Sequence, residues 1–269
     1  MTTIQKAESM KTAHSAAHDG PLGIQEMNYK NPPIVEAVVQ ISFEKAIGVT
    51  DVDRVADRLL KSYASRSDRQ TMTASLDTAS GKLISSIQKV GVELRDDFAT
   101  KVLIIDTSFL LLSALAPYGG WDALESRLMD EIERFRKIVG PLKLSRLGMR
   151  FVNRIDAPVA NGAPDYGRYV RAQPTHLALP DVPMSGFLVQ ISQPLHLEGG
   201  SYTLSCGSVE SPLLGYFGIS VDIDVSVTKS MTLHLQKILD ILREMRNQKN
   251  YLFESIITEE ARSMFGVVK

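Results

Sequence analysis

Cysteine is almost missing from this chain of 269 residues, which contains Cys206 and no second cysteine. One cysteine cannot form a disulfide within the chain or supply a cysteine-rich zinc site, so both features are excluded. Its expected place is the core, as a small buried apolar side chain. No apolar run approaches the length that crosses a bilayer. Residues 1–20 have no apolar core segment, so we expect no signal peptide and a reducing, cytoplasmic setting.

An excess of charge of one sign is missing as well. The chain has 30 basic and 31 acidic side chains and a formal net charge of −1. We therefore expect no attraction of the whole surface to nucleic acid or to an anionic membrane. The motifs typical of nucleotide hydrolysis, dinucleotide binding, α/β-hydrolases and zinc proteases do not occur. These absences weigh against an enzyme of a familiar class, and no cofactor is expected.

What the chain does contain is the pattern of a globular protein, with 44% hydrophobic and 23% charged residues. Residues 1–30 show no sustained apolar period and are expected to form a flexible arm. Between 31 and 157 the pattern predicts strand, helix, two or three strands, helix and strand. That order matches the split βαβ, or ferredoxin-like, topology, in which the first and last strands lie side by side. The segments are a strand in 33–43, a helix in 50–66, strands in 71–77, 81–97 and 100–115, a helix in 118–141 and a strand in 146–156.

The second half, residues 158–269, begins with a proline-rich connection that rules out a long regular strand. A hairpin closed at residues 199–200 follows, and then a strand in 216–227 that alternates apolar and polar residues. A long helix in 231–257 and a short helix capped by Thr258 complete the pattern. The sequence as a whole predicts an α+β fold with a large, mostly antiparallel sheet. Helices are expected on one face of this sheet. The second half is expected to pack on the first, either by extending its sheet or by building a second sheet on it.

The strand at residues 146–156, RLGMRFVNRID, has the most unusual composition. Successive side chains of a strand point to opposite faces, so Arg146, Arg150 and Arg154 share one face. Asn153 falls on the other face, among apolar residues that are expected to face the core. A buried amide requires hydrogen-bond partners, so Asn153 either fixes a loop or lines a pocket. Three arginines on one face require acidic partners or a ligand.

Two interpretations of this arginine face stay open. In the first, Arg150 forms a cross-strand ion pair with Glu36 of the first strand or with another acid, and the arginines are structural. In the second, the face binds an anion or a protein, because the planar guanidinium recognises carboxylate and phosphate through two hydrogen bonds. The candidate residues for binding a ligand or partner are then Glu36, Arg146, Arg150, Asn153 and Arg154.

Asp222 and Asp224 project from one face of a later strand, roughly 7 Å apart at the spacing of alternate strand residues. Two carboxylates with a further acidic ligand are able to hold a divalent ion, which makes this pair a minor metal candidate. Ordinary alternation on a half-solvated strand is the commoner explanation. The alternative function is therefore a metal-dependent hydrolase or phosphoesterase, with Glu36, Asp222 and Asp224 at the metal and Arg150 on a phosphate.

Several segments together resemble a known set of proteins. They are PIVEAVVQISFE, LAPYGGWDALE, RLGMRFVNRID, ISVDIDV and NYLFESIITEE, and the most specific positions are Pro117, Tyr118, Trp121, Glu125 and the strand from Arg146 to Ile155. Beyond the N-terminal arm, the chain resembles a sporadically distributed bacterial family of similar length that carries a TIGR-type label and no assigned function. The resemblance implies a bacterial, single-chain protein and brings no catalytic residues. Its sporadic distribution is similar to that of mobile or defence-linked genes and implies a conditional role beside a partner.

The sequence therefore favours a non-enzymatic binding or regulatory protein. Its expected partner is another protein, a second copy of the chain or a small anionic ligand, engaged through the face of Arg150 and Arg154. A place beside a toxin or another defence effector is compatible with this hypothesis. Neither a membrane nor nucleic acid is an expected partner.

Overall fold

The computed structural model describes residues 27–77, 82–160, 162–175 and 182–268. In these residues a nine-stranded antiparallel sheet packs against four α-helices, which confirms the expected α+β class and the large sheet. The chain order begins with β1 (Ile34–Phe43), α1 (Val49–Leu59), β2 (Ser65–Asp77), β3 (Lys82–Arg95), β4 (Lys101–Asp106), β5 (Phe109–Leu115), α2 (Trp121–Val139) and β6 (Lys143–Pro158). It continues with β7 (Leu188–Pro194), β8 (Gly200–Val209), β9 (Tyr216–Thr232), α3 (Leu235–Ile256) and α4 (Glu259–Phe265).

The strand order in the sheet is β2-β3-β4-β5-β1-β6-β9-β8-β7. β1 and β6 lie side by side near the centre, as the sequence pattern requires of its first and last strands. β9 pairs with β6 along nearly the whole of both strands, from Lys143 opposite Thr232 to Pro158 opposite Tyr216. The second half of the chain therefore extends the sheet of the first half, and the two halves share one sheet.

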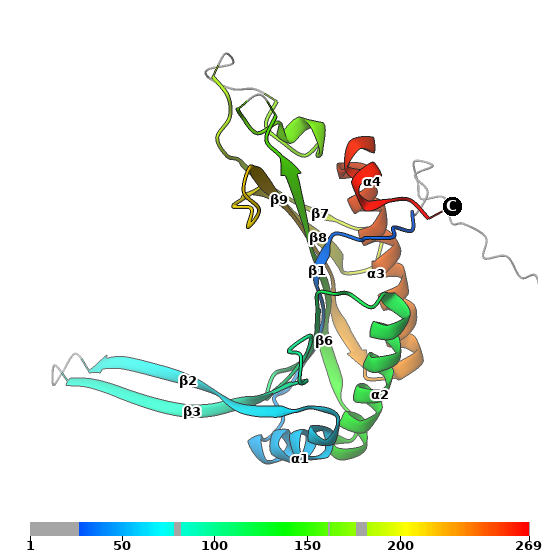
Figure 1. Cartoon of the computed structure of the whole chain (residues 1–269). Helices are drawn as coiled ribbons and strands as arrows, with labels where there is room; N and C mark the ends of the chain where they lie inside the picture. The colour runs from blue at the N-terminus through cyan, green and yellow to red at the C-terminus, as the bar shows by residue number, and fades with distance from the viewer. Residues whose placement is uncertain (1–26, 78–81, 161, 176–181, 269) are drawn as a thin grey trace, which may run out of the picture.

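The helices lie on one face of this sheet, and the described residues leave most of the opposite face uncovered (Figure 1). Alternation along β1 shows the division. Ala37, Val39 and Ile41 are almost completely buried beneath the helices, as the sequence predicts. Val38 and Gln40 point to the other side, where they line a groove. We call this helix-free side the open face.

Residues 100–115 depart from the sequence prediction. One long strand is expected there, but the chain turns at Thr107 and Ser108 and forms two strands, β4 and β5, which pair with each other. The Asp106 carboxylate forms the turn by accepting hydrogen bonds from the Ser108 backbone N–H at 3.0 Å and from its hydroxyl at 2.8 Å. The turn contains no glycine or proline, and apolar residues flank it on both sides, so the apolar pattern did not indicate it.

The flexible arm expected at residues 1–30 lies mainly outside the described residues. Its last part belongs to the folded body, because Tyr29 forms a β-bridge with Val267 and its hydroxyl donates to Glu254. Arg262 donates from Nε to the same carboxylate at 3.0 Å. Burial and the Glu254 carboxylate raise the pKa of the Tyr29 phenol. The entry to β1 is thus fixed against α3 and α4.

Helix ends follow the signals in the sequence. α2 lies between Gly120 and Gly140. The φ angles of these two glycines, 92° and 82°, lie in the left-handed region that favours glycine. Thr258 caps α4 by accepting a hydrogen bond from the backbone N–H of Ala261 at 3.4 Å, as predicted. Among the described helices, none combines the length and the apolar character needed to span a membrane.

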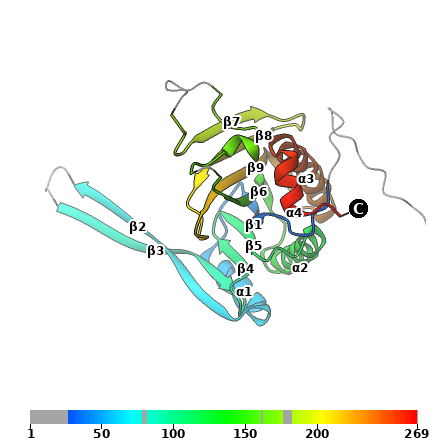
Figure 2. The ribbon, with the colours of Figure 1, turned by 45° about the horizontal axis from the view of Figure 1, so that its top comes forward.

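β2 and β3 form a two-stranded ribbon that projects from the body (Figures 1 and 2). β3 pairs with β4 only from Gly91 to Arg95, so the remainder of β3 has β2 as its strand neighbour in the described sheet. Ion pairs of Arg66 and Lys89 with Asp53 tie the base of the ribbon to α1. The sequence predicts strands here but not their projection, because a strand pattern does not show how far the strand continues beyond the core.

Candidate functional site

The open face carries a groove of about 470 Å³ near the centre of the sheet. Its floor is apolar and comes from three adjacent strands, β4, β5 and β1. The floor residues are Val38, Val102, Ile104, Leu111 and Leu115. Val102 is buried and the other four are partly buried, although no described helix covers this face of the sheet. The floor is therefore the part of the groove that best indicates contact with another molecule.

Charged side chains surround this floor in equal numbers of each sign. Three are cationic and three are anionic, so the rim has little net charge. The six are Glu36, Glu93, Arg95, Arg146, Arg150 and Asp224. Three of the residues expected to bind a ligand, namely Glu36, Arg146 and Arg150, are thus brought together by the fold.

Gly148 allows Arg146 to lie along the strand. A Cβ at residue 148 would be 2.3 Å from Nη1 of Arg146, so the guanidinium occupies the space that a side chain would fill. From there Nη2 of Arg146 donates to the two carboxylate oxygens of Asp224 at 3.3 and 3.4 Å. Burial raises the pKa of the Asp224 carboxyl, and the nearby charges of Arg146 and Arg150 oppose that rise. The glycine in RLGMR has a packing role that the sequence pattern did not reveal.

Arg150 forms the cross-strand ion pair that the first interpretation predicts, with Asp222 as the acid. Its Nε donates to Oδ1 at 2.8 Å and its Nη2 donates to Oδ2 at 2.6 Å. The hydrogen bonds to Asp222 raise the pKa of the Arg150 guanidinium. The positive charge of Arg150 on β6 is therefore balanced by an aspartate of β9, the strand that lies beside β6.

Glu36 also lines the groove, but its hydrogen-bond partner is a serine and not an arginine. Its Oε1 accepts a hydrogen bond from the hydroxyl of Ser113 on β5 at 2.7 Å. The Glu36 charge also favours the ionised form of Arg150, as a smaller contribution than that of Asp222. Of the two options that the sequence left open for Arg150, Glu36 or another acid, the structure shows the second. The acid is Asp222, because β9 lies beside β6, a pairing that the sequence pattern did not predict.

Arg154 and Asn153 lie outside the groove. Arg154 donates from Nε to Asp156 at 2.9 Å and from Nη2 to the backbone carbonyl of Glu210. Asn153 points to the helix side, is 3% exposed, and donates from Nδ2 to the Val221 carbonyl at 3.0 Å. The expectation that this buried amide has a hydrogen-bond partner is confirmed. Neither side chain contributes to the open-face groove.

A second cavity of about 210 Å³ lies on the helix side and includes Asn153 in its lining. Aromatic side chains form much of its wall. The Nζ of Lys249 lies 4.2 Å from the ring centroid of Phe151, and the Arg246 guanidinium lies 5.6 Å from that of Trp121. The two cavities are on opposite sides of β6, because alternate residues of that strand point to opposite faces.

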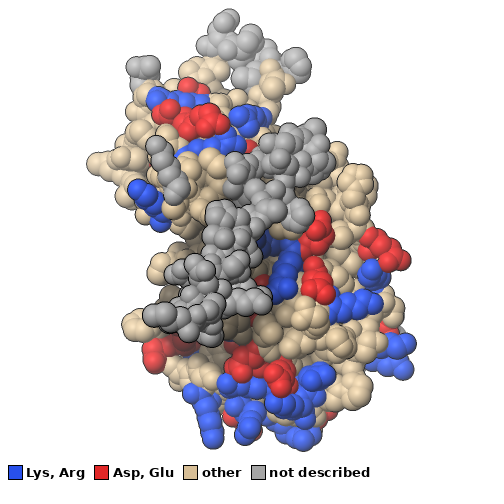
Figure 3. Space-filling model, turned by 90° about the vertical axis from the view of Figure 1, so that its right-hand side faces the viewer, with Lys and Arg blue, Asp and Glu red and all other residues tan. Residues whose placement is uncertain are grey.

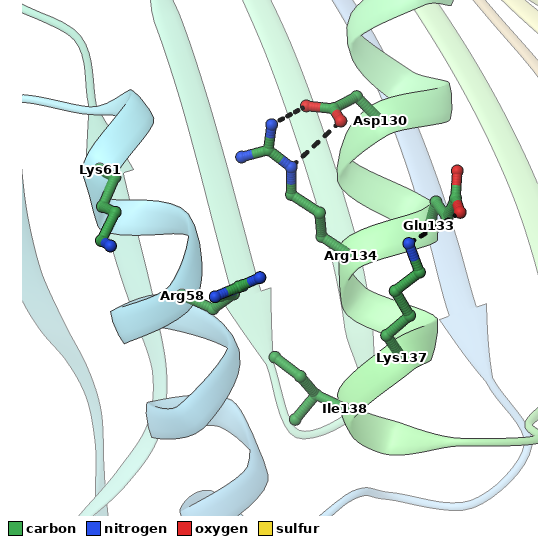
Figure 4. A pocket seen from close by; sticks show the side chains of 7 residues that line it. All are labelled: Arg58, Lys61, Asp130, Glu133, Arg134, Lys137 and Ile138. Atoms are coloured by element: carbon green, nitrogen blue, oxygen red, sulfur yellow. Dashed lines mark hydrogen bonds and ion pairs between the residues drawn. The ribbon is translucent and has the colours of Figure 1, made fainter.

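A third hollow, of about 620 Å³, lies between α1 and α2. Lysine and arginine gather over this lower end of the molecule (Figure 3). Figure 4 shows Arg58 of α1 reaching into the gap, while on α2 Arg134 turns to Asp130 and Lys137 turns to Glu133. These are exposed pairs four residues apart on one helix, which contribute little to stability. The hollow is a solvated helix surface without an apolar floor.

Arg127 anchors α2 to the sheet behind the groove. It donates to the backbone carbonyls of Val102 and Ser113, each at 2.8 Å, and these residues belong to β4 and β5. Its Nε also donates to Glu131 at 2.8 Å, and the Tyr63 hydroxyl donates to the same carboxylate. Burial raises the pKa of the Glu131 carboxyl, and Arg127 opposes that rise. This network holds the strands of the groove floor against α2.

The two aspartates of the minor metal candidate have arginine partners in the structure. Asp222 and Asp224 are each bound by an arginine, as described above. Within the part of the chain that the structure describes, no three His, Cys, Asp or Glu side chains are placed to hold one metal ion. The hydrolase alternative therefore has no set of ligands in the described residues.

The apolar floor and the acidic and basic residues of β3 were not among the candidates from the sequence. A signal for the floor was present, since KVLIID and FLLLSAL have apolar residues at consecutive positions. Consecutive apolar positions place apolar side chains on both faces of a strand. One face of β4 and β5 packs under the helices, and the other face forms the floor of the groove.

The fold and the groove define an α+β protein with one open-faced antiparallel sheet. Comparison with known proteins found no family model that matches the sequence and no curated protein that matches it. The resemblance to the TIGR-type family stays a prediction. Function is therefore argued from the groove itself.

Proposed function

We propose that this protein is a non-enzymatic binding protein that holds a polypeptide segment of a partner in the open-face groove. The observation that carries the proposal is the apolar floor formed by β4, β5 and β1 on a sheet face that the described helices do not cover. Apolar surface surrounded by polar side chains is typical of protein interaction sites. A polypeptide segment can supply apolar side chains to the floor and polar groups to the rim.

The electrostatics of the rim support a polypeptide over a small anion. Arg146 and Arg150 are each engaged by an aspartate, and the rim as a whole is balanced in charge. A small anion would have to compete with these carboxylates for the guanidinium groups. Arg150 is 51% exposed and remains accessible to hydrogen-bond acceptors of a partner without losing Asp222. A small anionic ligand is accordingly the less favoured occupant.

Three finer properties belong to this proposal. The first half is proposed to be ferredoxin-like, and the order β4-β5-β1-β6 supports this with β2 and β3 as an added ribbon. A cytoplasmic setting is supported by the single cysteine, Cys206, which is free and buried. A role beside a toxin or defence effector is supported only by the resemblance described above.

A selection experiment tests the groove. The full-length protein is immobilised, and a phage library of random linear peptides is selected on it. We expect enriched peptides that are neutral and apolar at alternate positions, because the floor is apolar and the rim is balanced. Binding of these peptides to the Leu111→Glu variant should be lost, since that substitution places a charge on the floor.

The control is Leu214→Glu, the same chemical change at a leucine that is fully exposed outside the groove. This variant should bind the peptides as well as the wild type does. Circular dichroism and melting curves establish that both variants are folded. Peptides that bind Leu111→Glu unchanged, or a selection that enriches no sequence, would refute a polypeptide site in the groove.

A further inference from the structure

The β2–β3 ribbon has two unequal faces. Met72 lies directly opposite Ile87 in the ladder, and Leu83 is four residues from Ile87, so these three side chains share one face. They are 70%, 66% and 71% exposed. Thr71 and Thr73 point to the other face. The ribbon thus presents an apolar face to solvent along its projecting part.

The apolar face of the ribbon lies on the same side of the sheet as the helices. At the base of the ribbon, α1 packs on this side. Lys89 marks the boundary, because it pairs with Asp53 of α1 and with Asp68 at 2.7 and 2.8 Å. Ile87 is two residues further along β3 and so lies on the same face, beyond the helix. A two-stranded ribbon alone is marginally stable in water, so contact of this face with another apolar surface would stabilise the projecting part.

The ribbon also carries no charged residue between its base and the last pair of its ladder, Asp77 and Lys82. Residues 70–76 and 83–88 contain no Asp, Glu, Lys or Arg. Exposed edge strands commonly carry charged residues that prevent pairing with other chains, and β2 is an edge strand without such protection over this stretch. A neutral, amphipathic ribbon suits a neutral, apolar receptor surface.

The open-face groove has the complementary character. Its floor is apolar, its arginines are engaged by aspartates, and it adjoins the base of the ribbon through Glu93 and Arg95 of β3. The ribbon leaves the body on the side of the sheet away from α2 and α3, which is also the side of the groove (Figures 1 and 2). Each chain therefore carries an apolar groove on its open face and a ribbon that projects toward that side, and the apolar face of the ribbon continues the side of the sheet that α1 covers.

We propose that two copies of this chain exchange ribbons, each placing the apolar face of its β2–β3 ribbon in the open-face groove of the other. This inference rests on the proposed function, because it names the polypeptide that the groove holds. Reciprocal exchange about a two-fold axis is a closed arrangement that covers both ribbons and both grooves. No row of like charges is brought together, since the ribbon is neutral between residues 70 and 76 and the rim is balanced.

The size of the contact fits a dimer that forms reversibly. At about 3.3 Å per residue, the projecting part of each strand is roughly 25 Å long. Exchange of two ribbons buries on the order of 1,000 Å², the lower bound expected for a specific interface between proteins. A concentration-dependent dimer is therefore expected.

Sedimentation velocity over a dilution series tests the exchange. The full-length wild type should shift from monomer to dimer as its concentration rises. Ile87→Lys in the ribbon and Leu111→Glu in the groove should each reduce the dimer strongly, whereas Phe98→Lys, at an 85% exposed side chain in the turn after β3, should leave it unchanged. A monomer at every concentration overturns the exchange, as does a dimer that either of the first two variants leaves intact.

Cysteine cross-linking tests the contact in a way that does not depend on loss of binding. Two single-cysteine variants, Ile87→Cys and Val38→Cys, are prepared with tags of different length so that their products can be told apart. The two proteins are mixed and oxidised. A mixed disulfide dimer is expected, and replacing Val38→Cys by Leu214→Cys should abolish it. No mixed product, or an equal yield with Leu214→Cys, overturns the exchange.

The two proposals fail separately. If the wild type is monomeric and the cysteine variants yield no mixed disulfide, yet the wild type selects peptides that Leu111→Glu no longer binds, the groove holds a polypeptide other than the ribbon. If it also selects no peptides, the groove is not a polypeptide site and both proposals are wrong.

Discussion

Arg150 of β6 and Asp222 of β9 form a bidentate ion pair on the open face, with hydrogen bonds of 2.8 and 2.6 Å. The pair is diagonal, because Arg150 lies opposite Asp224 in the ladder and Asp222 lies opposite Val152. Arg146 in turn reaches along its own strand to Asp224. Neighbouring strands thus carry matched rows of opposite charge, and five predictions concern these and the other ion pairs of the fold.

The Arg150–Asp222 pair should contribute little to stability. Arg150 is 51% exposed, so solvent screens the pair and the ordering of the side chains offsets part of the gain. A double-mutant cycle with Arg150→Ala and Asp222→Ala, measured by urea unfolding, should give a coupling below about 1 kcal/mol. A coupling of several kcal/mol would show that the pair behaves as a buried one.

The Arg127–Glu131 pair should behave in the opposite way. Its side chains are 13% and 7% exposed. Arg127→Met leaves Glu131 buried without its cation and should cost about 3–5 kcal/mol. The matched control is Arg150→Met, the same change at the exposed pair, which should cost less than about 1 kcal/mol. Equal losses in the two variants, measured by urea unfolding, would contradict the assigned burial.

The Arg127→Met variant should also depend on pH. Burial raises the pKa of Glu131 above its ordinary value of 4.5, and removal of Arg127 increases that rise. The folded state then holds its proton more tightly than the unfolded chain does, so stability falls as the pH increases above 4.5. Unfolding curves at several pH values should show the loss relative to wild type growing in that direction. A loss that is constant with pH would argue against a buried carboxyl.

Gly148 should control the titration of Asp224. In Gly148→Ala the new Cβ displaces the Arg146 guanidinium, because the two occupy the same space. Arg146 lowers the pKa of Asp224, so its displacement should raise that pKa further. Carboxyl carbon NMR during a pH titration measures the shift. Arg146→Ala should have the same effect and Arg154→Ala, whose side chain lies on Asp156, should have none.

Glu125 should contribute to stability at neutral pH and lose that contribution at acidic pH. Hydrogen bonds from Arg243 and from the Trp121 indole hold its pKa below the ordinary value of 4.5. The contribution of Glu125 is therefore present at neutral pH and is lost as the pH falls through its folded-state pKa. Glu125→Gln should melt a few degrees below wild type at neutral pH and together with wild type in strong acid. The control Glu198→Gln, at an 86% exposed side chain, should melt with wild type at neutral pH.

Features that depend on neighbouring residues in the sequence were predicted well. The core face of β1, the two faces of β6 and the cap at Thr258 follow from periodicity and local hydrogen bonding. The turn at Asp106 was missed because its signal is a side-chain hydrogen bond, which an apolar pattern does not contain. Of the candidate residues, Glu36, Arg146 and Arg150 line the groove, whereas Asn153 and Arg154 lie outside it.

Local patterns in the sequence are enough to predict the α+β class and the alternation that separates the arginines from the core, and they include the neutral composition of residues 70–76. These are local properties, fixed by the periods of helix and strand and by the order of residue types. Three features depend on how distant parts of the chain pack together: the pairing of Asp222 and Asp224 with the arginines, the second apolar face of β4 and β5, and the projection of the β2–β3 ribbon from the body. Strand order and register join residues far apart in the chain, and they are set by the packing of the whole core.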